Sequence, residues 1–343
     1  MLANILKEAL NRKASDIILS TGTKPSIKLL GEVVMLEDFD VLDKDTVSKL
    51  ALSIMSETGR EKFQKNKELD FSVAMGDARF RVNAFVEKKG YGLVFRVIPD
   101  KVPEFDSLGF PQIIKEFTKK GSGLVLVTGA VGSGKSTTMA SLVEEINKNY
   151  QKHIITVEDP IEFSFENKRS LVEQREVGST TLTFENGLKY ALRQAPDVIM
   201  VGEMRDLESF RLALRAAETG NLVFATLHTA GAARTVARII DMFPSGEKDQ
   251  IKAQLSGSLI GVVWQKLLKT NDGKGRVPAV EVMINTTSVG NIIRKGDNHQ
   301  LDGVIETSSS EGMISMKKSL EDLRGKDLIS QEKFEEELLS LGK

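Results

Sequence analysis

The chain has 343 residues and is 41% hydrophobic, which allows at least one large core and favours two domains over one. Its 47 basic and 48 acidic side chains leave a net charge of −1, so no overall positive field would attract nucleic acid or anionic lipid. There are no cysteines, which excludes disulfides and cysteine-ligated zinc, and the three histidines lack metal-ligand spacing.

The start of the chain, residues 1–16, predicts an amphipathic helix interrupted by charges, without the apolar core of a signal peptide. Nowhere do about 18 apolar residues run together, so we expect no membrane span and a soluble, cytoplasmic protein. Residues 1–98 as a whole predict a mixed α and β domain. After the first helix we expect a strand at 16–20, a strand pair around 26–36, a helix over 45–65 and a hairpin within 78–99.

The hairpin carries two arginines of interest. A two-residue turn at Lys88 and Lys89 places apolar residues of both strands on one face and sets Arg81 directly opposite Arg96. The apolar pairs expected are Phe80–Val97, Val82–Phe95 and Ala84–Leu93. Two like charges side by side repel each other, so the arginine pair invites an anion, although two solvated surface arginines are the alternative.

Three prolines, Pro99, Pro103 and Pro111, then favour an extended connection. We therefore predict an N-terminal domain over 1–98, a linker over 99–112 and a second domain over 113–343. In the second domain, apolar strands alternate with helical stretches, which predicts an α/β fold with a mainly parallel sheet covered on both faces. The strands are expected at 123–128, 153–159, 197–203, 222–228 and 277–284.

The stretch TGAVGSGKSTT, residues 128–138, fits the G-x-x-x-x-G-K-[ST] phosphate loop and lies between a strand and a helix, as that loop requires. Its glycines let backbone N–H groups wrap phosphates, and the helix adds its positive N-terminal end. Lys135 is expected to contact the β and γ phosphates of ATP, and Ser136 the Mg²⁺ ion. The nucleotide-binding residues predicted in this loop are Gly129, Gly132, Ser133, Gly134, Lys135, Ser136 and Thr137.

Polar side chains follow three other strands, at the end where α/β sheets bind ligands. Glu158 and Glu162 follow the first, Glu203 the second and His228 the third. Phosphoryl transfer needs a carboxylate that orients water, a second that helps to hold Mg²⁺, and a donor near the terminal phosphate. Asp197 competes with Glu203 as the Mg²⁺ ligand, but about 20 Å of strand separates the two, and Glu203 is preferred. Glu158 is assigned to nucleotide binding, and a structural role remains the alternative for His228.

Such sites often also require an arginine, which a neighbouring subunit can supply. The arginines of the second domain lie on or beside predicted helices, where solvated or salt-bridging roles are common. We therefore expect Arg81 and Arg96 to complete a site that belongs to the next subunit.

With these residues in place, the chain resembles the PilT-like retraction motors of type IV pili, within the type II and type IV secretion ATPase superfamily. The resemblance covers nearly the whole chain. It includes ASDIILS, RFRVNAF, GAVGSGKSTT, ITVEDPIEF, LRQAPDVIMVGEMRDLES and RAAETGNLVFATLHT.

The resemblance implies a PAS-like α+β N-terminal domain, a RecA-like P-loop ATPase domain with a C-terminal helical region, and a homo-hexamer. It implies a cytoplasmic motor, docked at the inner face of the inner membrane on a pilus platform protein, that removes pilin subunits and drives twitching motility. A related accessory ATPase is a further partner, and nucleic acid is not one. Glu162 would be the catalytic base, Glu203 the Walker B acid and His228 the histidine-box residue, with Arg81 and Arg96 reaching across the subunit boundary.

Three positions depart from the family pattern: Ile18 and Asn221 each stand where relatives often show histidine, and the retraction-associated segment at 288–295 reads SVGNIIRK. In that segment Gly290 replaces an arginine and Lys295 a glutamate. An accessory ring ATPase acting mainly through partner contacts, or a secretion or pilus-assembly ATPase, is therefore the alternative function. The missing zinc cysteines disfavour an assembly motor, and a nucleic-acid translocase is a remote option.

Overall fold

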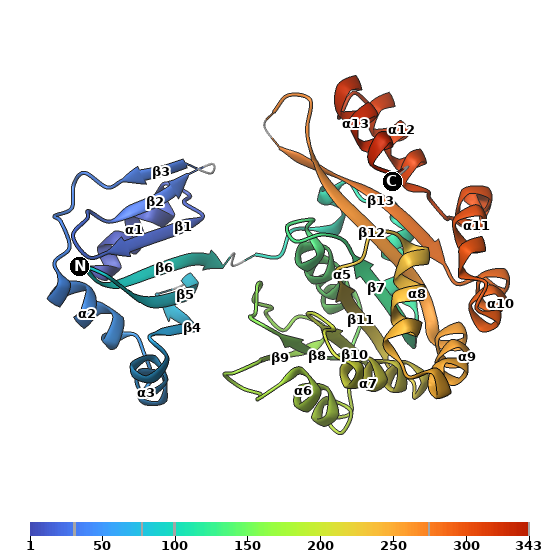
Figure 1. Cartoon of the computed structure of the whole chain (residues 1–343), viewed down its shortest axis with the longest axis horizontal. Helices are drawn as coiled ribbons and strands as arrows, with labels where there is room; N and C mark the ends of the chain where they lie inside the picture. The colour runs from blue at the N-terminus through green and yellow to red at the C-terminus, as the bar shows by residue number, and fades with distance from the viewer. Residues whose placement is uncertain (30–31, 77, 99–100, 274, 342–343) are drawn as a thin grey trace. The chain divides into compact units, whose positions relative to one another are not determined.

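The computed structural model describes residues 1–29, 32–76, 78–98, 101–273 and 275–341, and its course is shown in Figure 1. The chain forms two compact units, Met1–Lys101 with Glu162–Ser164, and Val102–Ile161 with Phe165–Lys343. Residues 99 and 100 of the predicted linker, and residues 342 and 343 of the predicted second domain, lie outside the described residues. Within the described ranges, no helix is both long enough and apolar enough to cross a bilayer.

The first unit is a six-stranded sheet with helices, in the strand order β3-β2-β1-β6-β5-β4, and all its strand pairs are antiparallel. Its core joins α1 and α2 to the sheet, through residues such as Ile5, Val47 and Phe95. Its elements are α1 (Leu2–Asn11), β1 (Asp16–Ser20), β2 (Ser26–Leu29), β3 (Glu32–Met35), α2 (Lys44–Ser53), α3 (Glu57–Asn66), β4 (Glu68–Met75), β5 (Ala78–Glu87) and β6 (Gly90–Ile98).

The predicted hairpin register is confirmed, because β5 and β6 turn at residues 88–89 and place Arg81 opposite Arg96. The single helix predicted over 45–65 is wrong, since α2 ends before Ile54 and α3 begins after Ser56. The hydroxyl of Ser56 accepts the N–H of Gly59 at 3.1 Å and caps the second helix. A serine that satisfies a backbone N–H in this way competes with a continuous helix.

The second unit has a seven-stranded sheet in the order β13-β12-β7-β11-β10-β8-β9, in which only the β12–β13 pair is antiparallel among the described strands. The α/β fold with a mainly parallel sheet is therefore confirmed. The strands are β7 (Gly123–Thr128), β8 (His153–Glu158), β9 (Leu171–Glu176), β10 (Val198–Val201), β11 (Leu222–Leu227), β12 (Leu259–Lys269) and β13 (Arg276–Ile284).

Helices and short 3₁₀ turns complete the second unit. The α-helices are α4 (Gln112–Lys115), α5 (Lys135–Asn149), α6 (Phe184–Ala191), α7 (Leu207–Glu218), α8 (Ala232–Met242), α9 (Lys248–Ser258), α10 (Thr287–Lys295), α11 (Leu301–Thr307), α12 (Met316–Gly325) and α13 (Gln331–Leu341). The 3₁₀ turns are Phe105–Leu108, Glu116–Lys119, Ser245–Glu247, Asn298–Gln300 and Ser309–Glu311.

Both faces of this sheet are buried. Leu124 and Leu126 of β7 pack in a core with residues of α6 to α11, and the alternate residues Val125 and Val127 pack in a second core with α5. Side chains alternate along a strand, so the apolar run of β7 serves both faces. Trp264 is buried and lies on strand β12 of the long β12–β13 hairpin, although the apolar spacing around it would also suit a helix.

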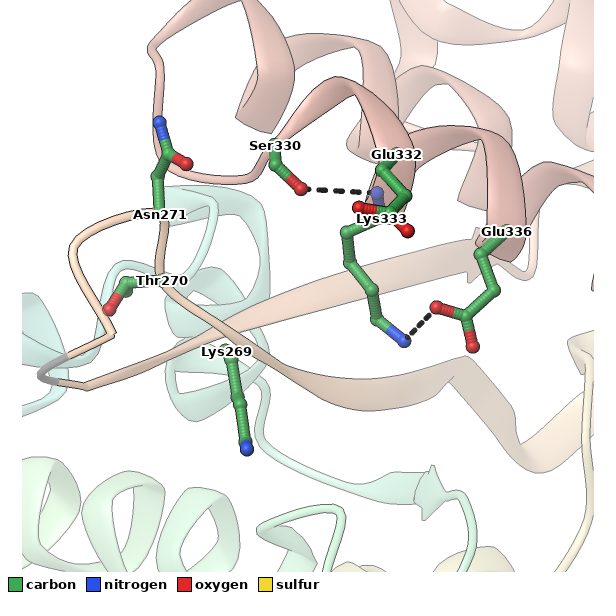
Figure 2. Close-up of a pocket in the computed structure, with 7 residues that line it drawn as sticks. All are labelled: Lys269, Thr270, Asn271, Ser330, Glu332, Lys333 and Glu336. Carbon is green, nitrogen blue, oxygen red and sulfur yellow. Dashed lines mark hydrogen bonds and ion pairs between the residues drawn. The ribbon is translucent and has the colours of Figure 1, made fainter.

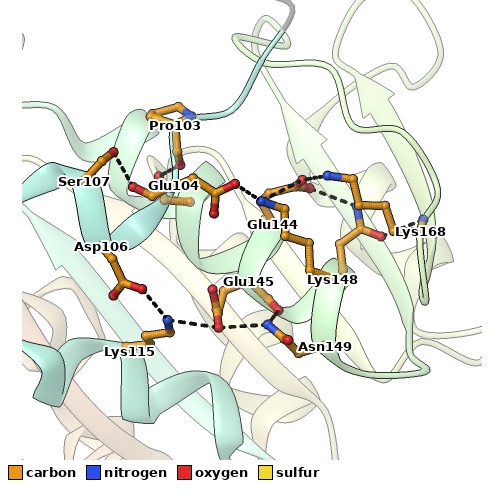
Figure 3. A network of polar contacts seen from close by, with 12 residues as sticks. Pro103, Glu104, Asp106, Ser107, Lys115, Glu144, Glu145, Lys148, Asn149 and Lys168 are labelled. Carbon is orange, nitrogen blue, oxygen red and sulfur yellow. Dashed lines mark hydrogen bonds and ion pairs between the residues drawn. The ribbon is translucent and has the colours of Figure 1, made fainter.

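Helix α5, which follows the phosphate loop, is fixed at its C-terminal half by polar contacts (Figure 3). The hydroxyl of Ser141 donates to the carbonyl of Pro103 at 2.9 Å, and Lys148 pairs with Glu104. Figure 3 also shows Lys115 between Asp106 and Glu145, and Lys168 against Glu144. Segments on either side of α5 in the sequence therefore hold it on the sheet.

Candidate functional site

The phosphate loop, residues 129–134, connects β7 to α5 in backbone conformations that suit glycine. Gly129 and Gly134 have φ values of +146° and +87°. A Cβ atom on Gly129 would lie 2.4 Å from the carbonyl oxygen of Gln265, so no side chain fits there. The loop thus passes close to β12, and its backbone can curl around a ligand.

Gln265 of β12 fixes this loop, and no sequence pattern indicates that role. Its amide donates to the carbonyl of Ser133 at 2.7 Å, and its carbonyl accepts the hydroxyl proton of Thr138 at 3.0 Å. Gln265 is fully buried, so both hydrogen bonds are shielded from water. The amide therefore joins the loop to the first turn of α5.

Lys135 is the first residue of α5, and its ammonium group turns back over the loop. Its Nζ donates to the carbonyl oxygens of Gly129 and Ala130, both at 2.9 Å, and lies 3.3 Å from Nδ1 of His228. Lys135 is buried, so its positive charge lies beside the N–H groups of the loop and adds to their attraction for an anion.

Glu203 and His228, from the ends of neighbouring strands, continue a chain of contacts from Lys135. The Nε2 atom of His228 lies 3.1 Å from Oε1 of Glu203, whose Oε2 accepts from Arg205 at 2.7 Å. Arg205 also lies 3.6 Å from Asp159. An ammonium can only donate, so Nδ1 of His228 accepts and the Nε2 proton faces Glu203. The sequence placed Arg205 among the salt-bridging arginines without identifying its partner.

Opposing influences act on the pKa of Glu203. Burial alone would raise this pKa, but the hydrogen bond from Arg205 and the electrostatic influence of Arg205, His228 and Lys135 outweigh it and lower the pKa. Glu203 is therefore ionised at neutral pH and can serve as an oxygen ligand.

The loop fits nucleotide phosphates and Mg²⁺. Among the described residues the buried hydroxyl of Ser133 has no hydrogen-bond partner, and Ser136 and Thr137 carry hydroxyls on the first turn of α5. Mg²⁺ prefers oxygen ligands and is commonly held by one or two protein groups together with substrate phosphates. Across the described residues no cluster of three or more His, Asp or Glu side chains could hold a metal alone.

Glu158 lies at the end of β8, and neighbouring side chains use its carboxylate. It is 6% exposed and accepts from the hydroxyl of Thr156 at 2.6 Å and from the amide of Gln174 at 3.1 Å. Its predicted contact with the nucleotide stays a prediction.

The remaining predicted site residues belong to the first unit. Glu162 is exposed and groups with that unit, as do Arg81 and Arg96. The guanidinium of Arg96 donates to Asp16 at 2.9 Å, because β1 pairs with β6 and brings these residues opposite each other. Asp16 of the same unit therefore supplies part of the negative charge that offsets the two arginines. The roles of Glu162, Arg81 and Arg96 in catalysis stay predictions.

Two departures from the family pattern have structural explanations. The amide of Asn221 donates to the carbonyl of Pro196 at 2.5 Å and ties the beginning of β11 to that of β10. Gly290 is buried in α10, and a Cβ atom there would lie 3.3 Å from both the Ser256 carbonyl and the Asn285 side chain. A large side chain at position 290 would displace these neighbours.

A separate surface cavity of about 250 Å³ lies between the end of β12 and the beginning of α13 (Figure 2). Lys333 points toward Glu336 there, at 2.9 Å, and pairs with Glu337 at the same distance. The residues that line the cavity are Lys269, Thr270, Asn271, Ser330, Glu332, Lys333 and Glu336. None of the predicted site residues lines this cavity, and we assign it no function.

Comparisons with known proteins give a matching family model and several relatives. The family model described as "Type II/IV secretion system protein" matches residues 1–300. The chain is 46% identical to the type IV pilus retractation ATPase PilT of Pseudomonas aeruginosa, over 98% of this chain and 97% of that protein. It is 46% identical to a twitching motility protein of Neisseria gonorrhoeae, over 90% and 82% of the two chains. A crystal structure of the pilus retraction motor PilT with bound ADP matches with a TM-score of 0.92 and 44% identity, over 98% and 96% of the two chains.

Proposed function

The chain belongs to the type II/IV secretion system protein family, and we propose that it is an ATP-hydrolysing motor that powers the retraction of type IV pili. One observation carries this proposal: the phosphate-loop lysine, His228 and Glu203 contact one another in a chain that matches a pilus retractation ATPase over nearly its whole length. A phosphate loop with an ionised carboxylate beside it is the arrangement that phosphoryl transfer requires.

Within the second unit, the loop N–H groups and Lys135 would hold the nucleotide phosphates. Ser136 and Glu203 would supply oxygen ligands for Mg²⁺, which when bound neutralises negative charge on the phosphates. His228 touches both Lys135 and Glu203, so its imidazole would link the lysine at the phosphates to the carboxylate. Glu158 would border the nucleotide.

The first unit would contribute across subunits. Glu162 would orient the attacking water as the catalytic base, and Arg81 and Arg96 would reach the nucleotide of a neighbouring subunit. This arrangement needs a homo-hexamer of PAS-like domains (1–98) and RecA-like domains (113–343). The ring would act in the cytoplasm on an inner-membrane platform protein, with a related accessory ATPase as a further partner.

An accessory ring ATPase is the second candidate function. It is favoured by the tight packing of Gly290, since the arginine that the retraction-associated segment carries at this position would have to shift Ser256 or Asn285. The contacts of Lys135, His228 and Glu203 favour the active motor instead.

The Mg²⁺-dependent ATP hydrolysis rate of the full-length protein tests the proposal, measured beside Glu162→Gln. The amide cannot accept a proton, so kcat should fall by about 10²-fold or more while ATP binding is retained. Glu166→Gln is the matched control, because Glu166 is an exposed glutamate four residues away, and its rate should stay within about twofold of wild type. A wild type that assembles but hydrolyses no ATP would favour the accessory role. A Glu162→Gln variant that hydrolyses ATP at the wild-type rate would show that Glu162 is not the catalytic base.

A further inference from the structure

Glu281 is a buried carboxylate on β13 that the proposed mechanism does not use. It is 9% exposed and lines a cavity of about 370 Å³ within the second unit. The other charged residues that line this cavity come from α8, β12, α11 and α12, and are Arg234, Lys266, Asp302, Glu306 and Lys317.

The carboxylate of Glu281 hydrogen-bonds the first residue of helix α8. Its Oε1 accepts the N–H of Ala232, which begins α8, at 2.8 Å. Residue Gly231 occupies the N-cap position of α8 and has no side chain with which to cap the helix. Glu281 therefore supplies the acceptor that the first turn of α8 needs.

The first turn of α8 in turn holds the segment that carries His228. The hydroxyl of Thr235 donates to the carbonyl of Gly231 at 2.7 Å and lies 2.6 Å from the hydroxyl of Thr229. His228 directly precedes Thr229 and reaches Lys135 on one side and Glu203 on the other. A short path of hydrogen bonds and backbone links thus runs from Glu281 to the imidazole.

We propose that Glu281 is a positioning residue for His228: by fixing the beginning of α8, it holds the imidazole between Lys135 and Glu203. The proposal rests on the ATPase function proposed above.

The electrostatics of Glu281 agree with a capping role and not an ion-pair role. Burial raises its pKa, and the N–H groups of Ala232 and Met316 only partly oppose this effect. Of the charged neighbours, Asp302 raises the pKa further and Arg234 lowers it. The N–H of Ala232 therefore holds the carboxylate, and an amide of the same shape accepts this hydrogen bond more weakly than an ionised carboxylate does.

The first test compares ATP hydrolysis by full-length wild type and Glu281→Gln. We expect kcat to fall about tenfold with KM for ATP within about twofold, because the phosphate loop is untouched while the support of His228 is weakened. Glu337→Gln is the matched control. Glu337 is 8% exposed and pairs with Lys266 and Lys333, and its loss should leave kcat within about twofold. Equal kcat values for wild type and Glu281→Gln would overturn the proposal.

A double-mutant cycle separates positioning from general weakening of the fold. If Glu281 acts through His228, adding Glu281→Gln to His228→Ala lowers kcat no further. The same fold reduction in both backgrounds would show that Glu281 acts independently of His228.

Hydrogen exchange tests the positioning role of Glu281 even if the wild type hydrolyses no ATP. In that case the proposed ATPase function fails, while the exchange result still decides whether Glu281 fixes the segment that carries His228. Amides of residues 228–236 should exchange faster in Glu281→Gln than in wild type or Glu337→Gln, with β7 and β11 unchanged. Glu281→Asp keeps the charge but shortens its reach by one methylene group, so it should show the same local increase. Unchanged exchange at 228–236 in both Glu281 variants would refute the positioning role.

Discussion

The two ends of the seven-stranded sheet carry the same residue types and use them differently. At the carboxyl end, Lys135, His228 and Glu203 contact one another beside the phosphate loop. At the amino end, a lysine, a histidine and an acid also lie together, but their contacts join the beginnings of neighbouring strands. The position along the strands, and not the residue types, distinguishes a ligand site from a structural cluster.

The amino-end contacts go largely to backbone groups. Asp197 accepts the N–H of His153 at 2.9 Å and the ammonium of Lys152 at 3.1 Å. The ring of His153 lies 3.2 Å from the carbonyl of Ala195 and 3.1 Å from Glu173. Because backbone groups satisfy Asp197 and His153, this cluster joins the beginnings of neighbouring strands and has no phosphate loop beside it.

The largest expected difference between the two ends comes from their lysines. Lys135→Ala removes the ammonium from the phosphate loop and should lower kcat/KM for ATP by about 10²-fold to 10³-fold. Lys152→Ala removes a partly exposed ion pair with Asp197 and should stay within about twofold of wild type. ATP hydrolysis rates of the two full-length variants test the contrast, and equal losses would show that the strand end does not decide function.

The two acids give the next contrast. Glu203→Gln removes a predicted Mg²⁺ ligand and should lower kcat by about 10²-fold and weaken its dependence on Mg²⁺. Asp197→Asn keeps an acceptor for the N–H of His153 but loses its charge toward Lys152. We expect a loss of about 1 kcal/mol of stability with kcat within about twofold of wild type. Mg²⁺ titrations of hydrolysis, together with thermal unfolding, separate the two outcomes, and an altered Mg²⁺ requirement in Asp197→Asn would contradict the comparison.

Local patterns were enough to predict the parts of the fold and site that depend on short segments. The phosphate loop needs eight consecutive residues and its flanking elements, and the β5–β6 register follows from one turn and the alternation of apolar residues. The break between α2 and α3 was also signalled locally, by Ser56 at a capping position, but the helical spacing around it masked the signal.

Other features arise from residues distant in sequence, which no single-sequence pattern brings together. Gln265 reaches Ser133 and Thr138 only because β12 lies beside β7, and Asp16 meets Arg96 only because β1 lies beside β6. The apolar run around Trp264 is compatible with a buried helix or a buried strand, and its pairing with β7 and β13 decides the matter.

The smallest expected effect concerns the pH dependence of stability, and it separates Glu203 from Glu281. The pKa of Glu203 is lowered, so its contribution to stability is present above the ordinary value of 4.5 and is lost as the pH falls through the lowered pKa. The pKa of Glu281 is raised, so its ionised form costs stability above that raised pKa, and the cost disappears below 4.5.

Thermal unfolding of the two glutamine variants between pH 4 and pH 8 therefore gives opposite trends. Relative to wild type, Glu203→Gln should become less stable as the pH rises and Glu281→Gln more stable, with each kcal/mol shifting Tm by about 2 °C to 4 °C. Burial affects both carboxylates, so burial by itself would predict the same trend for both. Opposite trends would show that Arg205, His228 and Lys135 keep Glu203 charged, whereas the backbone donors and Arg234 do not offset the burial of Glu281. Parallel trends would mean that the cations around Glu203 do not offset its loss of hydration.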